Sequence, residues 1–83
     1  MALNISYFAW VRERMGIAEE AVVVPSNVAT ISELVAWLAA RDERGAAAFG
    51  DPSRIRAAID GGIVPPDAML GKDIALFPPV TGG

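Results

Sequence analysis

The chain has 83 residues and a formal net charge of −3, from seven basic and ten acidic side chains. A chain of this length forms one domain with a small core, and its hydrophobic fraction of 53% argues against disorder. It contains no cysteine and no histidine. Thiolate chemistry, disulfides, the commonest general base and the commonest metal ligand are thereby excluded. The composition argues against an independent hydrolase or metalloenzyme, and we expect no metal site.

The charge pattern and the N-terminal residues narrow the class of protein further. The basic side chains are scattered among acidic ones, so no stripe favours nucleic-acid binding. The first residues lack the charged and apolar regions of a signal peptide, and no apolar run approaches the length of a membrane span. We therefore expect a soluble, cytoplasmic protein that binds neither nucleic acid nor membrane.

The first predicted element is a half-buried strand. Leu3, Ile5 and Tyr7 alternate with more polar neighbours, the period-two pattern of a strand with one face in the core. Phe8 then falls on the face opposite the core. An aromatic residue there is either covered by the segment that follows or contacts a partner, and the pattern alone leaves both interpretations open.

The middle of the chain predicts a hairpin followed by the main helix. Residues 10–15 fit a short helical turn closed by Gly16, and residues 20–24 fit a second strand. Thr30 and Glu33 have the spacing of a capping box, so a helix should begin there and run to about Arg41. Its core-facing stripe is predicted to consist of Ile31, Leu34, Val35 and Leu38.

The last third of the chain predicts a short helix and three more strands. Residues 46–49 fit the helix and residues 54–60 a third strand, with a tight turn at Gly61-Gly62 before the apolar pair 63–64. In the final strand, residues 74–77, Ile74 and Leu76 should face the core and Phe77 the outside.

This order of elements predicts an α+β fold, with a single mixed sheet packed on one main helix. We place the folded domain at residues 1–77 and an extended tail at residues 78–83. If the first and last strands pair at the centre of the sheet, Phe8 and Phe77 share one surface beside the tail. That surface would be an apolar docking patch, unless both rings are covered within the monomer.

The tail, Pro78-Pro79-Val80-Thr81-Gly82-Gly83, is the most informative segment. The two prolines fix φ and hold the chain extended, away from the domain. Gly82 and Gly83 carry no side chains, so a terminal carboxylate could pass down a narrow channel. At about 3.3–3.6 Å per residue the tail spans roughly 20 Å. A frayed end is the alternative, but the stiff stem after an aromatic residue favours delivery of the carboxylate into another protein.

A carboxylate is a poor electrophile until a nucleotide-dependent enzyme converts it into an acyl adenylate. Attack by an amine then gives an amide, and attack by a sulfur donor gives a thiocarboxylate. A carrier of this kind needs a long, narrow tail and a recognition surface, while catalytic acids and bases belong to its partners. Such chemistry is open to a chain without cysteine or histidine.

The residues of the tail carry a resemblance to a known family. The ending from Ala75 to Gly83 is similar to that of the small, sulfur-carrying subunits of molybdopterin synthase, which have a ubiquitin-like β-grasp fold. Tyr7-Phe8-Ala9 and Val11-Arg12-Glu13, followed by Gly16, resemble the first strand and turn of that family. The resemblance covers nearly the whole chain.

The resemblance implies a carrier without catalytic groups of its own, serving a sulfurtransferase complex. An activating enzyme would use ATP to adenylate Gly83, a sulfur donor protein would convert it to a thiocarboxylate, and no cofactor would be bound by the chain itself. The sulfur would pass to a cyclic pyranopterin precursor in the large subunit of a heterotetrameric synthase. The residues implied in partner binding are Phe8, Arg12, Phe77, Pro78, Pro79, Val80, Thr81 and Gly82.

Three positions depart from the family pattern, namely Asp60, Lys72 and Leu76. None lies in the tail, so they bear on the choice of partner more than on the carrier chemistry. Three alternative functions stay open: a carrier for thiazole or another sulfur-containing metabolite, a protein modifier joined through Gly83 to lysines, and an interaction module whose tail is never activated.

Overall fold

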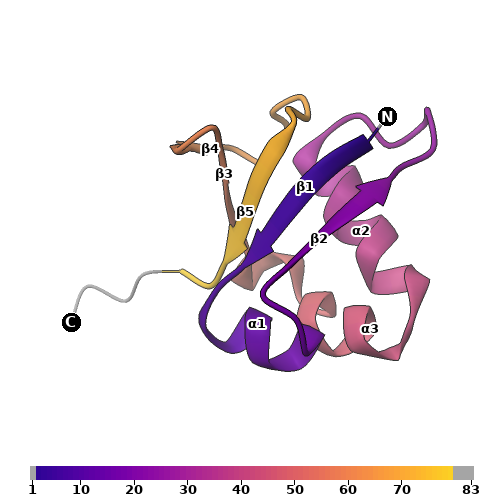
Figure 1. The fold of residues 1–83 in the computed structure, drawn as a ribbon, viewed down its shortest axis with the longest axis vertical. Helices are drawn as coiled ribbons and strands as arrows, with labels where there is room; N and C mark the ends of the chain where they lie inside the picture. The colour runs from indigo at the N-terminus through magenta and orange to yellow at the C-terminus, as the bar shows by residue number, and fades with distance from the viewer. Residues whose placement is uncertain (1, 80–83) are drawn as a thin grey trace.

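The structure, a computed structural model, describes residues 2–79. Five strands and three helices follow one another along the chain, with one 3₁₀ turn (Figure 1). They are β1 (Ala2–Tyr7), α1 (Ala9–Met15), β2 (Glu19–Val23), α2 (Ile31–Arg41), α3 (Glu43–Phe49), the 3₁₀ turn η1 (Pro52–Arg54), β3 (Arg56–Ile59), β4 (Gly62–Val64) and β5 (Asp73–Phe77).

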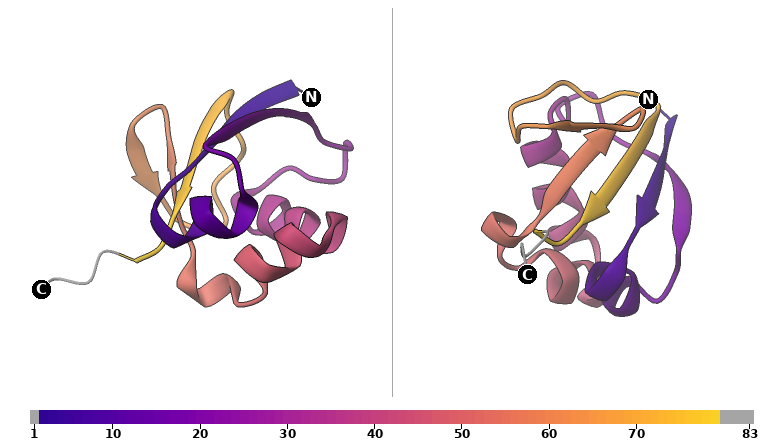
Figure 2. Two further views of the ribbon diagram at one scale, coloured as in Figure 1. Left: turned by 60° about the horizontal axis from the view of Figure 1, so that its bottom comes forward. Right: turned by 90° about the vertical axis from the view of Figure 1, so that its left-hand side faces the viewer.

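All five strands form one mixed sheet in the order β2-β1-β5-β3-β4. β1 and β5 are parallel and lie at its centre, while the other neighbouring pairs are antiparallel. The helices lie on one side of the sheet, as the turned views in Figure 2 show. The predicted α+β architecture, a β-grasp with a mixed sheet on one main helix, is confirmed.

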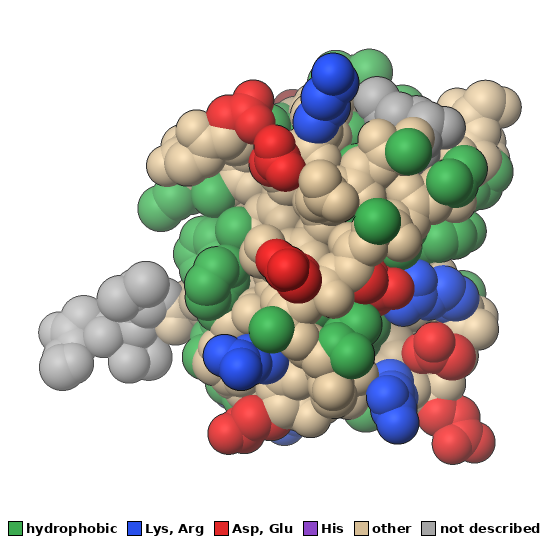
Figure 3. All heavy atoms as spheres, in the orientation of Figure 1, with side chains coloured by type: hydrophobic (Ala, Val, Ile, Leu, Met, Phe, Trp, Pro, Cys, Tyr) green, Lys and Arg blue, Asp and Glu red, His purple; other side chains and the backbone are tan. Residues whose placement is uncertain are grey.

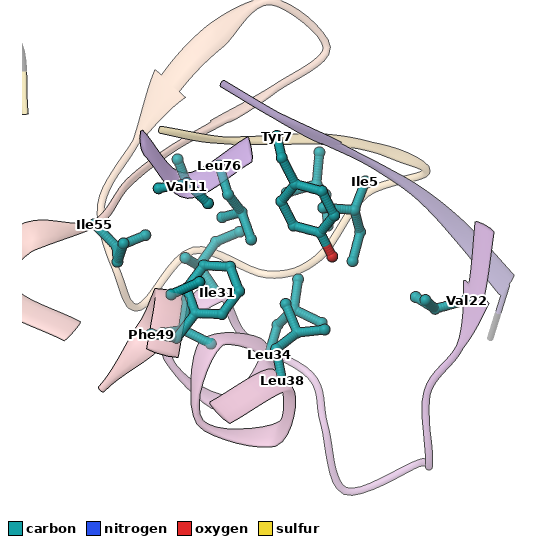
Figure 4. Close-up of a cluster of buried hydrophobic side chains, with 14 of the residues drawn as sticks. Ile5, Tyr7, Val11, Val22, Ile31, Leu34, Leu38, Phe49, Ile55 and Leu76 are labelled. Atoms are coloured by element: carbon teal, nitrogen blue, oxygen red, sulfur yellow. The ribbon is translucent and has the colours of Figure 1, made fainter. Parts of the chain in front are cut away.

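The core lies between the sheet and the helices (Figure 4). Leu3, Ile5 and Tyr7 are buried while their neighbours in β1 are not, which confirms the predicted alternation. Ile74 and Leu76 of β5 are buried beside them. The predicted stripe of α2 is buried as well, and its members are Ile31, Leu34, Val35 and Leu38.

The start of α2 is fixed by the predicted capping box. The backbone N–H of Glu33 donates to the Thr30 hydroxyl at 3.2 Å, and the Glu33 carboxylate accepts from the N–H of Thr30 at 3.0 Å. It also accepts from the N–H of Ala29, and these bonds hold the pKa of Glu33 below its usual value. The exchange satisfies donors that a helix start otherwise leaves free.

Two predicted boundaries were wrong because short side-chain caps were overlooked. The second short helix begins at Glu43 rather than residue 46, since the Asp42 carboxylate accepts from the N–H of Gly45 at 2.7 Å. The third strand begins at Arg56 rather than residue 54. There the Asp51 carboxylate caps η1 by accepting from the N–H of Ser53 at 3.2 Å.

The predicted tight turn lies one residue earlier than expected. Asp60 and Gly61 both have positive φ, 49° and 84°, and Gly62 already belongs to β4. Two consecutive residues with positive φ make the hairpin connection that matches the twist of the strands, and Asp and Asn tolerate it better than other side chains. Asp60 is therefore a conformationally conservative departure from Asn.

A part-buried polar group links the end of α2 to the sheet. The Tyr7 hydroxyl donates to the Glu20 carboxylate at 2.6 Å, and Arg41 at the end of α2 donates to both oxygens of that carboxylate, at 2.8 and 3.1 Å. Burial and the neighbouring Glu20 raise the pKa of Tyr7, so its hydroxyl stays a donor. The group joins β1, β2 and α2 through one carboxylate.

Gly45 allows α2 and α3 to approach closely. A Cβ at this position would lie 1.8 Å from the carbonyl oxygen of Leu38, so Gly45→Ala must push the two helices apart. We expect a loss of about 2 kcal/mol in the free energy of unfolding, measured by urea denaturation. The control is Gly62→Ala, whose Cβ would meet its nearest neighbour at an ordinary 3.7 Å. Equal stability of the two variants would contradict this account.

Glu20→Gln tests the polar group, and its effect should depend on pH. Burial raises the pKa of Glu20, but the hydrogen bonds from Arg41 and Tyr7 outweigh burial and bring it below the ordinary 4.5. The ionised carboxylate therefore stabilises the fold fully above that pH, and its contribution disappears as the pH falls through the folded pKa. We expect Glu20→Gln to cost about 1–2 kcal/mol at pH 7 and to approach wild-type stability at acid pH. A difference that is constant from pH 7 to pH 3 would refute the assignment.

Candidate functional site

The tail begins at the centre of the sheet. β5 ends at Phe77, with β1 on one side and β3 on the other. The backbone N–H of Phe8 donates to the carbonyl of Leu76 at 3.2 Å, and Arg56 is the register partner of Phe77. We call Phe77, Pro78 and Pro79 the tail root. Figures 1 and 2 show it leaving the body beside α1.

Phe8 is not covered by the segment that follows it. Its side chain is 50% exposed. Phe8 is extended, with φ −132° and ψ 155°, and Ala9 turns the chain into α1 with a positive φ of 53°. A positive φ is strained for alanine. This sharp reversal carries α1 to the helical side of the sheet and leaves the ring of Phe8 on the opposite side.

Phe77 lies on that same outer side. Ile74 and Leu76 of β5 are buried, and successive side chains of a strand point to opposite faces, so Phe77 faces outward and is half-buried. Tyr7 and Leu76 are register partners in the parallel pair, which puts Phe8 beside Phe77. The expected juxtaposition is thus present, while a role in partner binding stays a prediction.

An apolar surface extends from these two rings across the sheet. The register runs from Ala75 to Ala58 and on to Ile63, which is 76% exposed. Figure 3 shows hydrophobic side chains on this face beside the tail. We call it the outer patch, and its members are Phe8, Ala58, Ile63, Ala75 and Phe77.

Ile63 is a member of the outer patch that was not predicted from the sequence. It was read only as half of an apolar pair, and a three-residue strand gives too little alternation to assign a face. The nearby signal was the Asp-Gly turn, which fixes the register of β4 on β3 and so turns Ile63 outward. Small side chains at Ala58 and Ala75 leave a hollow of about 150 Å³ at the centre of the outer patch, bordered by Phe8 and by the polar residues Ser6, Asp60 and Asp73.

Arg12 is not a member of the outer patch. It is an exposed residue of α1, and its N–H donates to the carbonyl of Phe8 at 3.3 Å. It borders a separate hollow of about 510 Å³ together with Glu13 and Ile17. The structure therefore places Arg12 one helical turn from Phe8, at the side of the tail root.

Val80, Thr81, Gly82 and Gly83 lie outside the described residues, so their proposed roles and the division at residue 77 stay predictions. Pro78 and Pro79 follow β5 without regular secondary structure. Within residues 2–79 no group of three or more acidic, histidine or cysteine side chains is placed to hold a metal ion. In the same range no helix has the length and apolar character needed to cross a membrane.

Two curated relatives match almost the whole chain. The molybdopterin synthase sulfur carrier subunit of Escherichia coli is 36% identical over 83 residues, which cover 98% of this chain and 99% of that protein. The protein of the same name from Haemophilus influenzae is 32% identical with the same coverage.

Solved structures show the same fold at lower identity. SAMP1 from Haloferax volcanii superposes with a TM-score of 0.73 and 24% identity over the full length of both chains. A putative molybdopterin converting factor, subunit 1, from Pyrococcus furiosus gives 0.66 and 21%, covering 96% of this chain and 99% of that one. The model of the ThiS family matches residues 5–83. The chain therefore belongs to the ThiS family, as a β-grasp protein related over its whole length to molybdopterin synthase sulfur carrier subunits.

Proposed function

We propose that this chain is the sulfur-carrier subunit of a molybdopterin synthase, and that Gly83 carries the sulfur. The observation that carries the proposal is the full-length similarity, at 36% and 32% identity, to two proteins of that name. The position of the tail root supports it, because the strand leading into the Gly-Gly end is the central strand of the sheet. The strand that precedes the tail is therefore held by β1 on one side and by β3 on the other.

The chemistry proceeds at the terminal carboxylate. An activating enzyme transfers AMP from ATP to the Gly83 carboxylate and releases pyrophosphate. Sulfur at the sulfide level, delivered by a sulfur donor protein, then attacks the acyl carbon and displaces AMP, which leaves a thiocarboxylate. This sulfur bonds to the cyclic pyranopterin precursor, and water hydrolyses the acyl–sulfur bond so that the carrier ends as a carboxylate again. Two charged carriers supply the two sulfurs of one dithiolene.

The chain contributes positioning rather than acid–base catalysis. It has no histidine or cysteine, so proton transfers fall to the partners. Its own residues fix the start of the tail: Phe77 lies between Phe8 and Arg56, and the sheet register on both sides holds β5 in place. The prolines continue from this anchored end.

The large subunit of the synthase is the partner that we expect on the outer patch. An apolar surface with a small central hollow beside the tail root allows a second protein to pack on the sheet while the tail enters the active site of that protein. Arg12 lies close enough to Phe8 to contact the rim of that interface. The same arrangement suits a heterotetramer with one carrier at each end of a large-subunit dimer, in the cytoplasm.

The first test is the intact mass of the untagged protein after incubation with ATP, its activating enzyme and a sulfur donor. We expect a gain equal to the replacement of one oxygen by sulfur, mapped to Gly83. A chain with one residue added after Gly83 is the control and should gain nothing while unfolding at the same temperature.

Two outcomes would contradict the proposal. An unchanged mass with an active enzyme and an intact tail would favour an interaction module. ATP-dependent conjugates of higher mass in cell extract, with no thiocarboxylate, would favour a protein modifier, a function that shares the requirement for a free Gly83.

Phe8→Ala and Ile63→Ala test the outer patch. We expect each to weaken binding of the large subunit by about 10- to 100-fold, since truncating a large apolar hot-spot side chain costs about 2 kcal/mol or more. Calorimetric titration measures the affinity. Met69→Ala is the control, because Met69 is 68% exposed but pairs with Thr30 at the start of α2, away from the outer patch. Equal affinities for all three variants would show that the large subunit binds elsewhere.

A further inference from the structure

Two arginines flank one tryptophan on the helical side of the tail root. The guanidinium carbon of Arg14 lies 4.4 Å from the ring centroid of Trp10, and that of Arg54 lies 5.5 Å from it. Trp10 and Arg14 are one turn apart in α1, whereas Arg54 comes from η1. We call these three residues the arginine–tryptophan cluster.

The two positive charges of this cluster have no carboxylate partner. Among residues 2–79 the ion pairs within 4.0 Å all involve Arg41. Arg14 donates only to the neutral carbonyl of Ala47, at 3.4 Å. Both arginines are exposed, and Trp10 is half-buried against the core. The ring therefore carries two exposed guanidinium groups with no carboxylate within 4.0 Å, so each can pair with an incoming anion.

The cluster adjoins the tail root but not the outer patch. Trp10 follows Phe8 by two residues, and Arg54 precedes Arg56, the register partner of Phe77, by two. α1 and η1 lie on the helical side of the sheet (Figure 2), whereas Phe8 and Phe77 face the opposite side. The tail root thus has the outer patch on one side, with Arg56 next to Phe77, and the arginine–tryptophan cluster on the other.

We propose that the arginine–tryptophan cluster is a docking site for carboxylate side chains of the large subunit, the protein that encloses the tail in the proposed function. The inference rests on the proposed function, because only a protein that encloses the tail must also cover its root. Arginine pairs with carboxylates through two parallel hydrogen bonds. The chain as a whole is acidic, with a net charge of −3, so two unpaired arginines at this position favour an acidic surface and repel a basic one.

The test compares Arg14→Gln and Arg54→Gln with Lys72→Gln. All three remove one positive charge, but Lys72 lies in the turn before β5, at the opposite end of that strand from the tail root. Affinity and association rate are measured for the cognate large subunit and the cognate activating enzyme, at low and at physiological salt.

For the large subunit we expect each arginine variant to bind about three- to tenfold more weakly at low salt, mainly through slower association, with a shallower salt dependence. Lys72→Gln should stay within about twofold of wild type. The thermal unfolding temperature of every variant is measured as well. If the cluster only connected α1 with η1, the arginine variants would unfold at a lower temperature but would keep wild-type affinity in the folded state.

Three outcomes would overturn the inference. Wild-type affinity of both arginine variants for the large subunit would show that the cluster only connects α1 with η1 or, if binding of the activating enzyme alone is weakened, that it serves that enzyme instead. Equal losses in all three variants would show an effect of net charge alone. A raised KM for ATP in the activation reaction, with unchanged protein affinity, would assign the cluster to nucleotide phosphate. Each leaves the proposed function intact if wild type still gains sulfur at Gly83, whereas failure of that gain would remove the proposed function itself.

Discussion

The parallel pairing of β1 and β5 is the constraint on which the rest of this structure depends. Strands adjacent in space and parallel in direction need a crossover connection between them, and here the crossover is nearly the whole chain. Everything between Tyr7 and Asp73 must therefore pack against the pair or extend its sheet. The helices pack against the pair on one side, and β2, β3 and β4 extend its sheet.

This arrangement makes the two faces of the sheet unlike each other. The helical side buries the apolar residues of β1 and β5 together with the Tyr7 hydroxyl, whose hydrogen bond to Glu20 satisfies it there. The outer side keeps small residues, Ala58 and Ala75, at its centre and larger apolar ones, Phe8 and Ile63, around them. A carrier needs such a free face, because a partner must bind it without disturbing the core.

The central position of β5 also connects the fold with the proposed chemistry. A strand held by neighbours on both sides has a defined direction and a defined end, so the tail starts from a fixed point. The outer patch lies on one side of that point and the arginine–tryptophan cluster on the other. Apolar contact supplies affinity and unpaired charge supplies orientation and faster encounter, which together suit a carrier that must visit more than one protein.

Local signals in the sequence were enough to predict the fold. The alternation of Leu3, Ile5 and Tyr7 and the capping box at Thr30 depend on neighbours at most a few residues away, and both are present as predicted. Gly82 and Gly83 lie outside the described residues, so the prediction made from them rests on the sequence alone, on the absence of side chains there. From these residues the family and the proposed carrier function followed.

The tertiary structure decided which residues far apart in the chain meet. Whether Phe8 was covered depended on the backbone reversal at Ala9, and Ile63 became part of the outer patch only through the register of β4 on β3. The contact of Arg54 with Trp10 joins residues 44 positions apart in the numbering. Local pattern carries no information on such contacts, because they arise from the packing of whole elements. The sequence by itself determined the elements and the family, because both depend on local pattern, and packing alone decided the surfaces around the tail root.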